Sequence, residues 1–507
     1  MKDFMKKNHF FTYSKMCVLA VTGASALLLA SCAKDGYDDE SFDDGVSNQQ
    51  VAAVKADAIS ITASADGKTQ TISWPVVMGA GGYRVNLIDV SNPETPIIND
   101  SIVDGCQVTA KREEDVNYKL TILTLGNKKK NNTDATEPVL KEFSTFTPTH
   151  ATIPAGSDLT EWFAANPVPA GALNENYNYD LEGGKNYTIS GLIDFDGHKV
   201  TLRSNSKNDH PLITLASADA CINFTAGFNV KYIDWNCAAR VGAKGLFEFS
   251  KNTSVPSAKD VDPAKYKWDG PVITDPITIV NCKFTDLKCY LFFDNQVKTA
   301  CMTFLVDNCV VHMTPESNLG GGVFWTNKGG HINDLTVSNS TFYEPLETVG
   351  DYKYFYQAGL DKAPDLYADG TPEAQAATNT VTYANSTFYH VTWNGGQWGN
   401  YNGMQGKLYS YWIMTNCIFY DCSTSGSVPR RFLHGQAYAS SPANKTFANN
   451  TYMKNDGTFQ DPQNYDQSGT VIEEDPQFAN PAVGDFHISG ATQLARRTGD
   501  PRWLPAN

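Results

Sequence analysis

A short pattern recurs six times in the second half of the chain: a few strand-forming residues, one asparagine, and another strand-forming run. The corner asparagines are Asn281, Asn308, Asn339, Asn385, Asn416 and Asn449, at intervals of 27, 31, 46, 31 and 33 residues. Asparagine tolerates the left-handed backbone conformation, so the pattern predicts a sharp corner between two strands rather than a hairpin. Corners stacked at the strand spacing of about 4.8 Å would let the amide side chains hydrogen-bond along a ladder.

A second recurring run lies between these corners and supplies a third strand to each repeat. Its central residues are Phe247, Phe292, Phe324, Phe355 and Phe432. Three short strands per repeat are typical of a parallel β-helix, in which each coil buries its interior only against its neighbours. The residues after the corners are small, and we expect them inside the stack, where thiols behave as small hydrophobes: Cys282, Cys309, Ser340, Ser386 and Cys417. Because the chain has no CxxC pair, we predict no metal site of the zinc type.

The open ends of such a stack need covers. Residues 157–165 combine a capping residue, an early carboxylate and an apolar face, and predict a short helix over the first coil.

From residue 150 to residue 507 the chain resembles the pectate-lyase-like right-handed parallel β-helix, and more closely the surface lipoproteins of glycan-utilisation gene clusters. In that family segments like 475–478 and 484–488 close the far end. The resemblance implies an all-β fold, but the scaffold carries lyases, hydrolases, esterases and binders, so the reaction stays open.

Residues 1–31 predict a lipoprotein signal peptide. Four lysines precede an apolar stretch, Met16 to Ala30, that is short for a membrane span and ends in small residues. Leu29-Ala30-Ser31-Cys32 resembles a bacterial lipobox, which implies cleavage before Cys32 and lipidation of its thiol and new amino group. We therefore expect the membrane as a partner, reached through this lipid anchor.

Residues 32–56 form a predicted acidic tether. Six carboxylates crowd into positions 35–44, and a like-charge run of this density repels itself and stays solvated. The run also resembles the acidic tag that marks lipoproteins for the outer face of the outer membrane. This resemblance implies a location outside the cell. The resemblance to lipoproteins of glycan-utilisation gene clusters implies an outer-membrane glycan-uptake complex as a partner. The formal net charge of −15 without a basic run argues against nucleic acid as a partner.

Residues 57–147 alternate in strand fashion and resemble a fibronectin type III module, a small β-sandwich. Trp74 is placed to fill the core between two sheets, and Asn117-Tyr118 at the start of the longest run resembles a tyrosine corner. Such modules usually act as spacers, and carbohydrate binding is the alternative.

Aromatic residues predict a carbohydrate-binding surface. If the phenylalanine column points inward, the residues that follow it, among them Trp325 and Tyr356, face outward and can stack on sugar rings. If the alternation is inverted, the same residues belong to the core. A second group lies in the uncharged, glycine-rich segment 393–401: Trp393, Trp398 and Tyr401. Two long insertions, 251–276 and 350–380, are either walls of a groove or plain loops.

Candidate catalytic residues form a column five positions after the corners: Asp286, Met313, Glu344, His390, Asp421 and Lys454. Successive coils would bring Glu344, His390 and Asp421 within about 5 Å of one another, where they could share protons or hold a cation. The alternative is a solvated edge. Arg431, beside Arg430, is a candidate base for a lyase, which would also need calcium.

Two functions follow from these residues. The first is an outer-membrane surface lipoprotein that captures plant-type, pectin-like polysaccharide on a groove of the β-helix, with no cofactor. The second is a polysaccharide lyase, or a related carbohydrate-active enzyme, acting on uronate-containing glycans with Ca²⁺ as its cofactor. A structural or adhesive surface protein without a sugar ligand is a third possibility.

Overall fold

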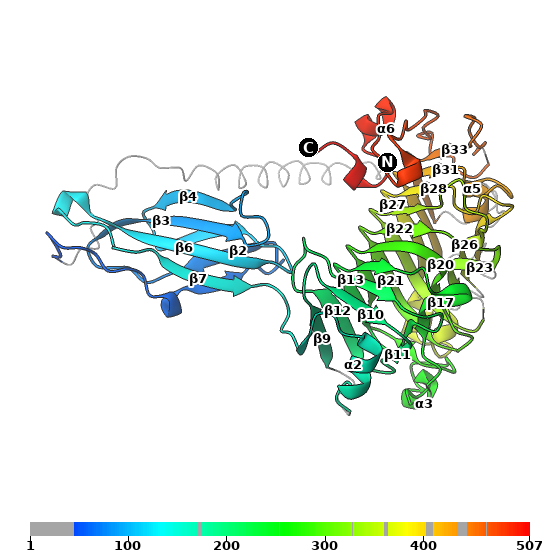
Figure 1. The fold of residues 1–507 in the computed structure, drawn as a ribbon, viewed down its shortest axis with the longest axis horizontal. Coiled ribbons are helices and arrows are strands. Elements are labelled where there is room, and N and C mark those ends of the chain that lie inside the picture. Colours follow the sequence, from blue (N-terminus) through cyan, green and yellow to red (C-terminus); the bar gives the residue numbers. More distant parts are fainter. Residues whose placement is uncertain are drawn as a thin grey trace, which may run out of the picture. The chain divides into compact units, whose positions relative to one another are not determined.

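The computed structural model describes residues 45–506, except 171–174, 253, 327, 359–363, 402–408, 434–443 and 463. The predicted signal peptide, Cys32 and the acidic part of the tether lie outside the described residues. The chain divides into two compact units, Met1–Ser144 and Thr145–Asn507 (Figure 1). No helix in the described ranges has the length and apolar character needed to cross a membrane.

The first unit is a β-sandwich of two antiparallel sheets. One sheet has the order β1 (Ser60–Ala63), β2 (Thr69–Ser73), β5 (Gln107–Lys111), and the other β4 (Ile98–Val103), β3 (Ala80–Asp89), β6 (Asn117–Gly126), β7 (Val139–Ser144). Alternating residues of the long strands, such as Val85 and Leu87, are fully buried between the sheets. Period-two alternation in the sequence therefore corresponds to one buried face on each sheet.

Two aromatic residues occupy the places predicted for them in this sandwich. Trp74 is buried and packs edge-on against Tyr83, with 5.3 Å between ring centroids. The Tyr118 hydroxyl accepts a hydrogen bond of 2.9 Å from the backbone N–H of Glu113, five residues upstream, as a tyrosine corner requires.

The folded part of the first unit begins earlier than predicted. Val51 and Val54 are buried, and the backbone N–H of Val51 donates to the carbonyl of Thr133. A 3₁₀-helix, η1 (Ala56–Ala58), then leads into β1. The predicted tether end at residue 56 is therefore wrong for this stretch, because its apolar valines pack on the sandwich instead of staying solvated.

The second unit is a parallel β-helix, and the chain visits its three sheets in turn (Figure 1). Sheet 1 contains β8 (Ala151–Ile153), β9 (Asn176–Leu181), β12 (Lys199–Ser204), β15 (Phe228–Lys231), β19 (Ile277–Val280), β21 (Ala300–Asp307), β24 (His331–Ser338), β27 (Asn379–Ala384), β30 (Ser410–Thr415) and β32 (Lys445–Ala448), with β18 (Val272–Ile273) added on β21. Sheet 2 contains β10 (Asn186–Ile189), β13 (Leu212–Leu215), β16 (Asp234–Asn236), β20 (Lys283–Phe293), β22 (Val310–Met313), β25 (Thr341–Tyr343), β28 (Thr387–Tyr389), β31 (Ile418–Tyr420) and β33 (Thr451–Met453). Sheet 3 contains β11 (Leu192–Asp194), β14 (Cys221–Phe224), β17 (Val241–Phe249), β20, β23 (Leu319–Thr326), β26 (Tyr352–Ala358) and β29 (Gln397–Tyr401). This arrangement confirms the predicted all-β fold, a small sandwich followed by a parallel β-helix.

The six corner asparagines join sheet 1 to sheet 2, and all have positive φ, from 48° to 55°. Most of their amides form the predicted ladder: Asn416 donates to Asn385 and accepts from Asn449, each at 3.0 Å. The ladder is interrupted once, because Asn339 donates to Asp307 instead of Asn308. Arg502, from the C-terminal segment, donates to the free Asn308 oxygen.

The interior of the stack is built from the two predicted columns. All members of the predicted phenylalanine column are buried: Phe247, Phe292, Phe324, Phe355 and Phe432. Rings of sheet 2 add to them and stack in register, for example Phe388 on Phe419 with 5.0 Å between centroids. The small residues after the corners are buried, and burial raises the pKa of the Cys282 thiol well above its usual range. The nine described cysteines form no disulfide. Thiols here therefore fill space, as predicted.

The two ends of the chain's second unit are covered differently. The predicted helix is α2 (Leu159–Ala165); Asp158 caps it, and Leu159 and Phe163 are buried at the first coil. The C-terminal segment 475–506 packs on the outer side of sheet 2, where Phe486 contacts Tyr343 and Trp503 donates to Thr341. This segment therefore covers the side of the stack as well as its end, which the closing-segment resemblance did not predict.

Candidate functional site

Aromatic residues of sheet 3 do not form the predicted open platform. The strand register places Trp325 level with Phe293 and Gln357, whereas Tyr356 is level with Phe324 of the core. An irregularity between Leu319 and Gly322 shifts the register by one residue, so that Tyr356 pairs with Phe324 and not with Trp325. Tyr356 is buried, so its prediction as a sugar-binding residue is wrong.

Trp325 keeps a partly exposed ring. It stacks on Phe293 at 5.0 Å, lies against Gly321, and has the ammonium group of Lys328 5.5 Å from its centroid. A Cβ atom on residue 321 would come within 2.3 Å of the indole, so only glycine leaves room for this ring. Trp325 is therefore a single half-buried aromatic residue rather than one member of an exposed strip.

The glycine-rich segment 393–401 is divided between core and surface. Trp398 has no exposed surface and stacks on Phe355 at 4.5 Å, and Tyr401 is likewise fully buried. Predicting these two residues as sugar-binding was wrong, because the aromatic interior of the stack takes them up. Trp393 is half-buried, and the next two residues, Asn394 and Gly395, are exposed.

The predicted polar column is the corner between sheets 2 and 3. Glu344, His390 and Asp421 directly follow β25, β28 and β31 on successive coils. His390 Nδ1 lies 2.7 Å from Asp421 Oδ2, and the indole Nε1–H of Trp393 donates to Glu344 Oε2 at 3.2 Å. All three column residues are buried, so the alternative of a solvated edge is wrong.

A fourth buried acid, Asp351, completes this cluster. It is 2% exposed and accepts hydrogen bonds of 2.7 Å from the backbone N–H groups of Tyr352 and Asn394. Burial raises the pKa of Asp351 to about 7. Burial, and then the neighbouring Asp351 carboxyl, raises the pKa of Glu344 well above its usual range. Both shifts favour the protonated forms of the two carboxyls in the folded chain.

Sequence reasoning missed Asp351 because it lies outside the column. It precedes β26, seven residues after Glu344, and only the return of the loop onto the next strand brings the two carboxyls together. The available signal was an acid directly before an aromatic strand run, Tyr352 to Tyr356, which is a weak pattern.

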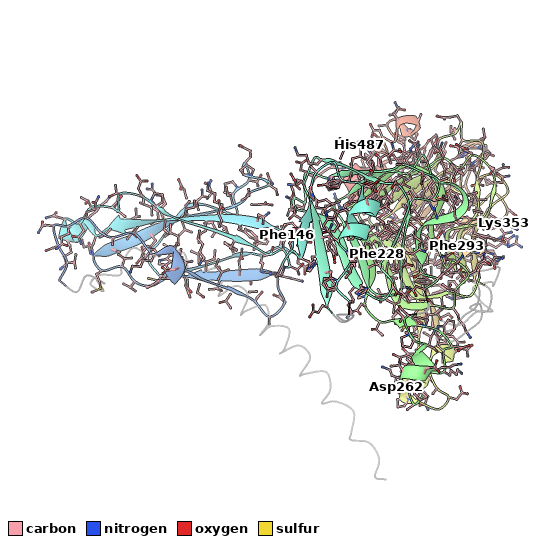
Figure 2. All side chains as sticks on the ribbon, turned by 60° about the horizontal axis from the view of Figure 1, so that its bottom comes forward. Phe146, Phe228, Asp262, Phe293, Lys353 and His487 are labelled. Atoms are coloured by element: carbon pink, nitrogen blue, oxygen red, sulfur yellow. The ribbon has the colours of Figure 1, made fainter. Side chains whose placement is uncertain are left out.

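Asp351 opens onto a pocket of about 210 Å³ at the edge where sheet 3 begins. Three successive coils each contribute three residues to its lining: 318–320, 351–353 and 394–396. The side chains of Asn318, Lys353 and Asn394 are exposed there, and Lys353 projects from the surface (Figure 2). Amides, an ammonium group and glycine backbone are the groups that bind hydroxyls and carboxylates.

Arg431 lies near this pocket but not where we expected it. It belongs to a short helix, α5 (Val428–Phe432), which takes the place of a sheet 3 strand in this coil. Its Nε donates to the carbonyl of Ser425, whose own N–H donates to Gly396 in the pocket wall. Burial, and then the neighbouring Arg430, lowers the pKa of Arg431. The third strand predicted around Phe432 is therefore wrong for this coil.

The two long insertions pack against each other at the corner between sheets 3 and 1. Tyr266 stacks on Tyr367 at 5.5 Å, and Lys267 forms ion pairs with Asp365 and Asp369. They are therefore ordered against one another over their described parts. Across the described ranges, no three His, Cys, Asp or Glu side chains gather closely enough to hold a metal ion.

Comparison with known proteins gives family matches without an activity. Residues 5–184 match the family DUF4992, residues 185–345 match DUF4957, and residues 335–503 match DUF5123, each described as a domain of unknown function. No curated protein matches the chain.

Two solved structures of pectate lyase PelI from Erwinia chrysanthemi are similar to it at 10% identity. The first has a TM-score of 0.23 and covers 78% of this chain and 99% of that chain. The second, in complex with tetragalacturonic acid, has a TM-score of 0.18 and covers 67% and 88%. The assignment of a parallel β-helix rests on the strand pairing of this chain itself.

Proposed function

We propose that the second unit binds polysaccharide, and specifically a uronate-containing, pectin-like glycan, at the pocket formed by residues 318–320, 351–353 and 394–396. The observation that carries this proposal is the convergence of Lys353, Asn318 and Asn394 from three successive coils on one small opening. A polymer that lies along the stack would meet equivalent positions on each coil in turn.

The charges around the pocket favour a carboxylated sugar. Lys353 is exposed at the opening, and Arg431 lies behind the Gly396 wall. Burial raises the pKa of Asp351, which lines the pocket, and of its neighbour Glu344. Their protonated forms are therefore favoured, which removes part of the repulsion that two carboxylates would exert on a uronate. Trp393, half-buried beside Asn394, supplies an apolar face for the sugar ring.

Affinity electrophoresis in gels that contain polygalacturonan, with a gel of neutral galactan beside it, tests the proposal. We expect polygalacturonan to retard the protein. Lys353→Ala should weaken retention about tenfold or more, as expected for a lost charge-assisted hydrogen bond. Lys185→Ala, an exposed lysine of the first coil, is the matched control. Retention that is absent, or equal in both variants, would overturn the proposal.

One observation favours an enzyme as the second candidate. The Asp351 carboxyl lines the pocket, and its raised pKa lets it donate a proton near neutral pH, as a general acid does. A carbohydrate-active enzyme would release reducing ends from polygalacturonan, and a lyase would also produce ultraviolet absorbance from unsaturated uronates. Asp351→Asn should abolish either signal, and Arg431→Ala should abolish the lyase signal. If neither signal appears with or without Ca²⁺, the enzyme candidate fails.

We also propose that the chain is a lipoprotein anchored through Cys32 in the outer membrane and facing outside, with the sandwich as a fibronectin III-like spacer. The lipobox-like residues 29–32 and the acidic run support the anchor, and the three-plus-four strand order with the Tyr118 corner supports the module. In this arrangement the protein would pass bound glycan to an uptake complex.

Metabolic labelling with an alkyne fatty acid tests the lipid anchor, and should label the wild type but not Cys32→Ala. Loss of the protein from intact cells treated with protease would support the outward orientation.

A further inference from the structure

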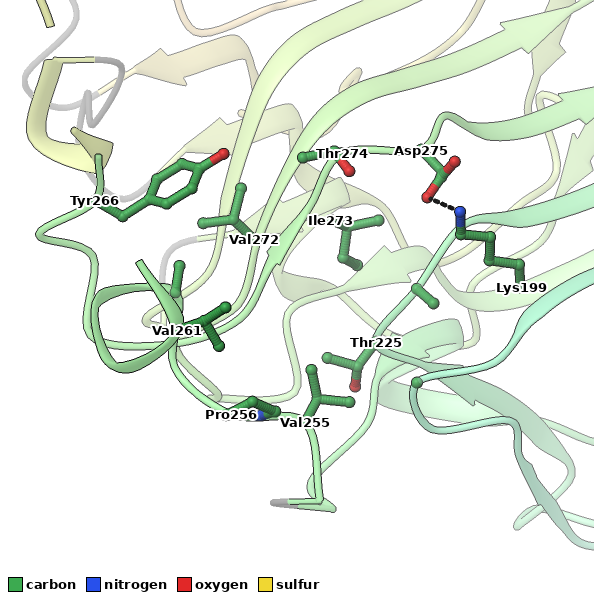
Figure 3. A pocket seen from close by; sticks show the side chains of 13 residues that line it. Lys199, Thr225, Val255, Pro256, Val261, Tyr266, Val272, Ile273, Thr274 and Asp275 are labelled. Carbon is green, nitrogen blue, oxygen red and sulfur yellow. Dashed lines mark ion pairs between the residues drawn. The ribbon is translucent and has the colours of Figure 1, made fainter. Parts of the chain in front are cut away.

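A larger pocket of about 420 Å³ lies elsewhere on the second unit and shares no lining residue with the first (Figure 3). It is bounded by the insertion 255–275 on one side and by residues of the earlier coils, including Lys199 and Thr225, on the other. Its volume falls within the range of about 300–1,000 Å³ typical of small-molecule sites.

Three properties of the lining point to a ligand. Thr225 is 4% exposed, and its hydroxyl has no hydrogen-bond partner among the described residues. Strand β18 forms one wall and pairs only with β21, so within the described chain its other edge has no strand neighbour. Val261 stands at the rim with 67% of its surface exposed. A buried hydroxyl without a partner is costly, and a ligand with hydroxyl groups would satisfy Thr225 and could also bond the open edge of β18.

The charged side chains of this pocket neutralise each other, which favours a neutral ligand. Among the described lining residues the charged ones are Lys199 and Asp275, which form an ion pair of 2.8 Å across one end (Figure 3). The pair leaves no net charge, but it still offers one donor and one acceptor to a vicinal diol. Val255, Val261 and Val272 supply apolar walls that match the CH face of a sugar ring. β18 is two residues long, too short to hold an added peptide strand firmly.

We infer that this pocket is a second binding site, specific for one or two neutral sugar residues. This inference goes beyond the proposed function, because the ligand class and the residues of this pocket differ from those of the uronate site. A glycan with both charged and neutral residues would engage both pockets.

Saturation-transfer difference NMR and isothermal titration of the purified full-length protein test the inference. The probes are the neutral disaccharides galactobiose, cellobiose and xylobiose, with digalacturonate as the charged comparison. We expect at least one neutral probe to bind saturably. Thr225→Val, which keeps the shape and removes the hydroxyl, should weaken that binding about three- to tenfold. Ala226→Phe, which fills the pocket, should abolish it.

Two controls keep this outcome separate from the uronate site. Thr446→Val changes an exposed threonine on β32 and should leave the neutral probe's affinity unchanged. Lys353→Ala should weaken polygalacturonan binding without changing the affinity for the neutral probe. The inference is overturned if no neutral disaccharide binds. It is also overturned if Ala226→Phe keeps full affinity with an unchanged circular dichroism spectrum, or if digalacturonate alone binds.

Discussion

The indole of Trp393 donates a hydrogen bond to the carboxyl group of Glu344, 3.2 Å away, although the two residues are 49 positions apart. Glu344 follows the sheet 2 strand of one coil, β25, and Trp393 follows that of the next coil, β28, so the bond links neighbouring coils. The Trp393 ring also stacks on His390 at 4.5 Å, which places it over the buried acidic cluster. A surface residue and a buried polar cluster thus depend on each other at the pocket edge.

The first prediction concerns pH and the Glu344–Asp351 pair. Both carboxyls have raised pKa values in the folded chain, with Asp351 at about 7 against 3.8 for the unfolded state. The folded state therefore binds more protons than the unfolded state, and stability falls as pH rises between about 4 and about 7. Asp351→Asn should remove up to about 4 kcal/mol of this decline.

Thermal unfolding at pH 4, 5, 6 and 7 measures this effect. The difference in melting temperature between the variant and the wild type should grow in favour of Asp351→Asn as pH rises. Asp219→Asn, an exposed aspartate, is the control and should follow the wild type. A constant difference across the series would show that the pKa of Asp351 is not raised in the folded chain.

The second prediction separates Trp398 from Trp393. Trp398→Ala should lower the free energy of unfolding by about 3–5 kcal/mol, because its ring fills the core against Phe355. Trp393→Ala should cost far less stability and reduce the retention by polygalacturonan. Urea denaturation and affinity electrophoresis of both variants measure the two effects. Equal stability losses would place Trp393 in the core as well.

The third prediction tests the corner ladder at Asn416. Asn416→Ala should destabilise the protein by about 2–3 kcal/mol, since alanine loses two side-chain hydrogen bonds and is disfavoured at a φ of 55°. Asn416→Gly tolerates that φ and should recover about 1 kcal/mol of the loss. Chemical denaturation of the three proteins gives both values. If glycine is no better than alanine, the strained backbone is not the reason for asparagine here.

The fourth prediction concerns the C-terminal segment. Phe486 is fully buried among Tyr343, Tyr389 and Phe478 on the outer side of sheet 2. Phe486→Ala should cost about 3–5 kcal/mol through the cavity that it leaves. Val483→Ala, three residues away and 73% exposed, should change the melting temperature little. Calorimetry on both variants distinguishes a structural cover from a loosely attached tail.

Periodic features were predictable because they depend on local geometry repeated many times. Asparagine at a left-handed corner and small residues behind it have the same role in every coil, so the fold, the ladder and the buried thiols could be predicted from spacing alone. The column of Glu344, His390 and Asp421 was found by the same reasoning. The burial of this column could not be predicted, because the sequence of one segment does not show which loops of other coils will cover it.

The pocket and the fate of the aromatic residues depend on details that act between coils. Tyr356, Trp398 and Tyr401 are buried because they pack on residues of neighbouring coils: Trp398 on Phe355, Tyr356 on Tyr401, and Tyr401 on Phe432 of α5. Asp351 meets Glu344 only because the loop between them closes onto the next strand. The amino-acid pattern thus established the stack and its corners, since these follow from backbone conformation residue by residue. The site required the folded structure, since register and loop closure are set by packing between distant segments.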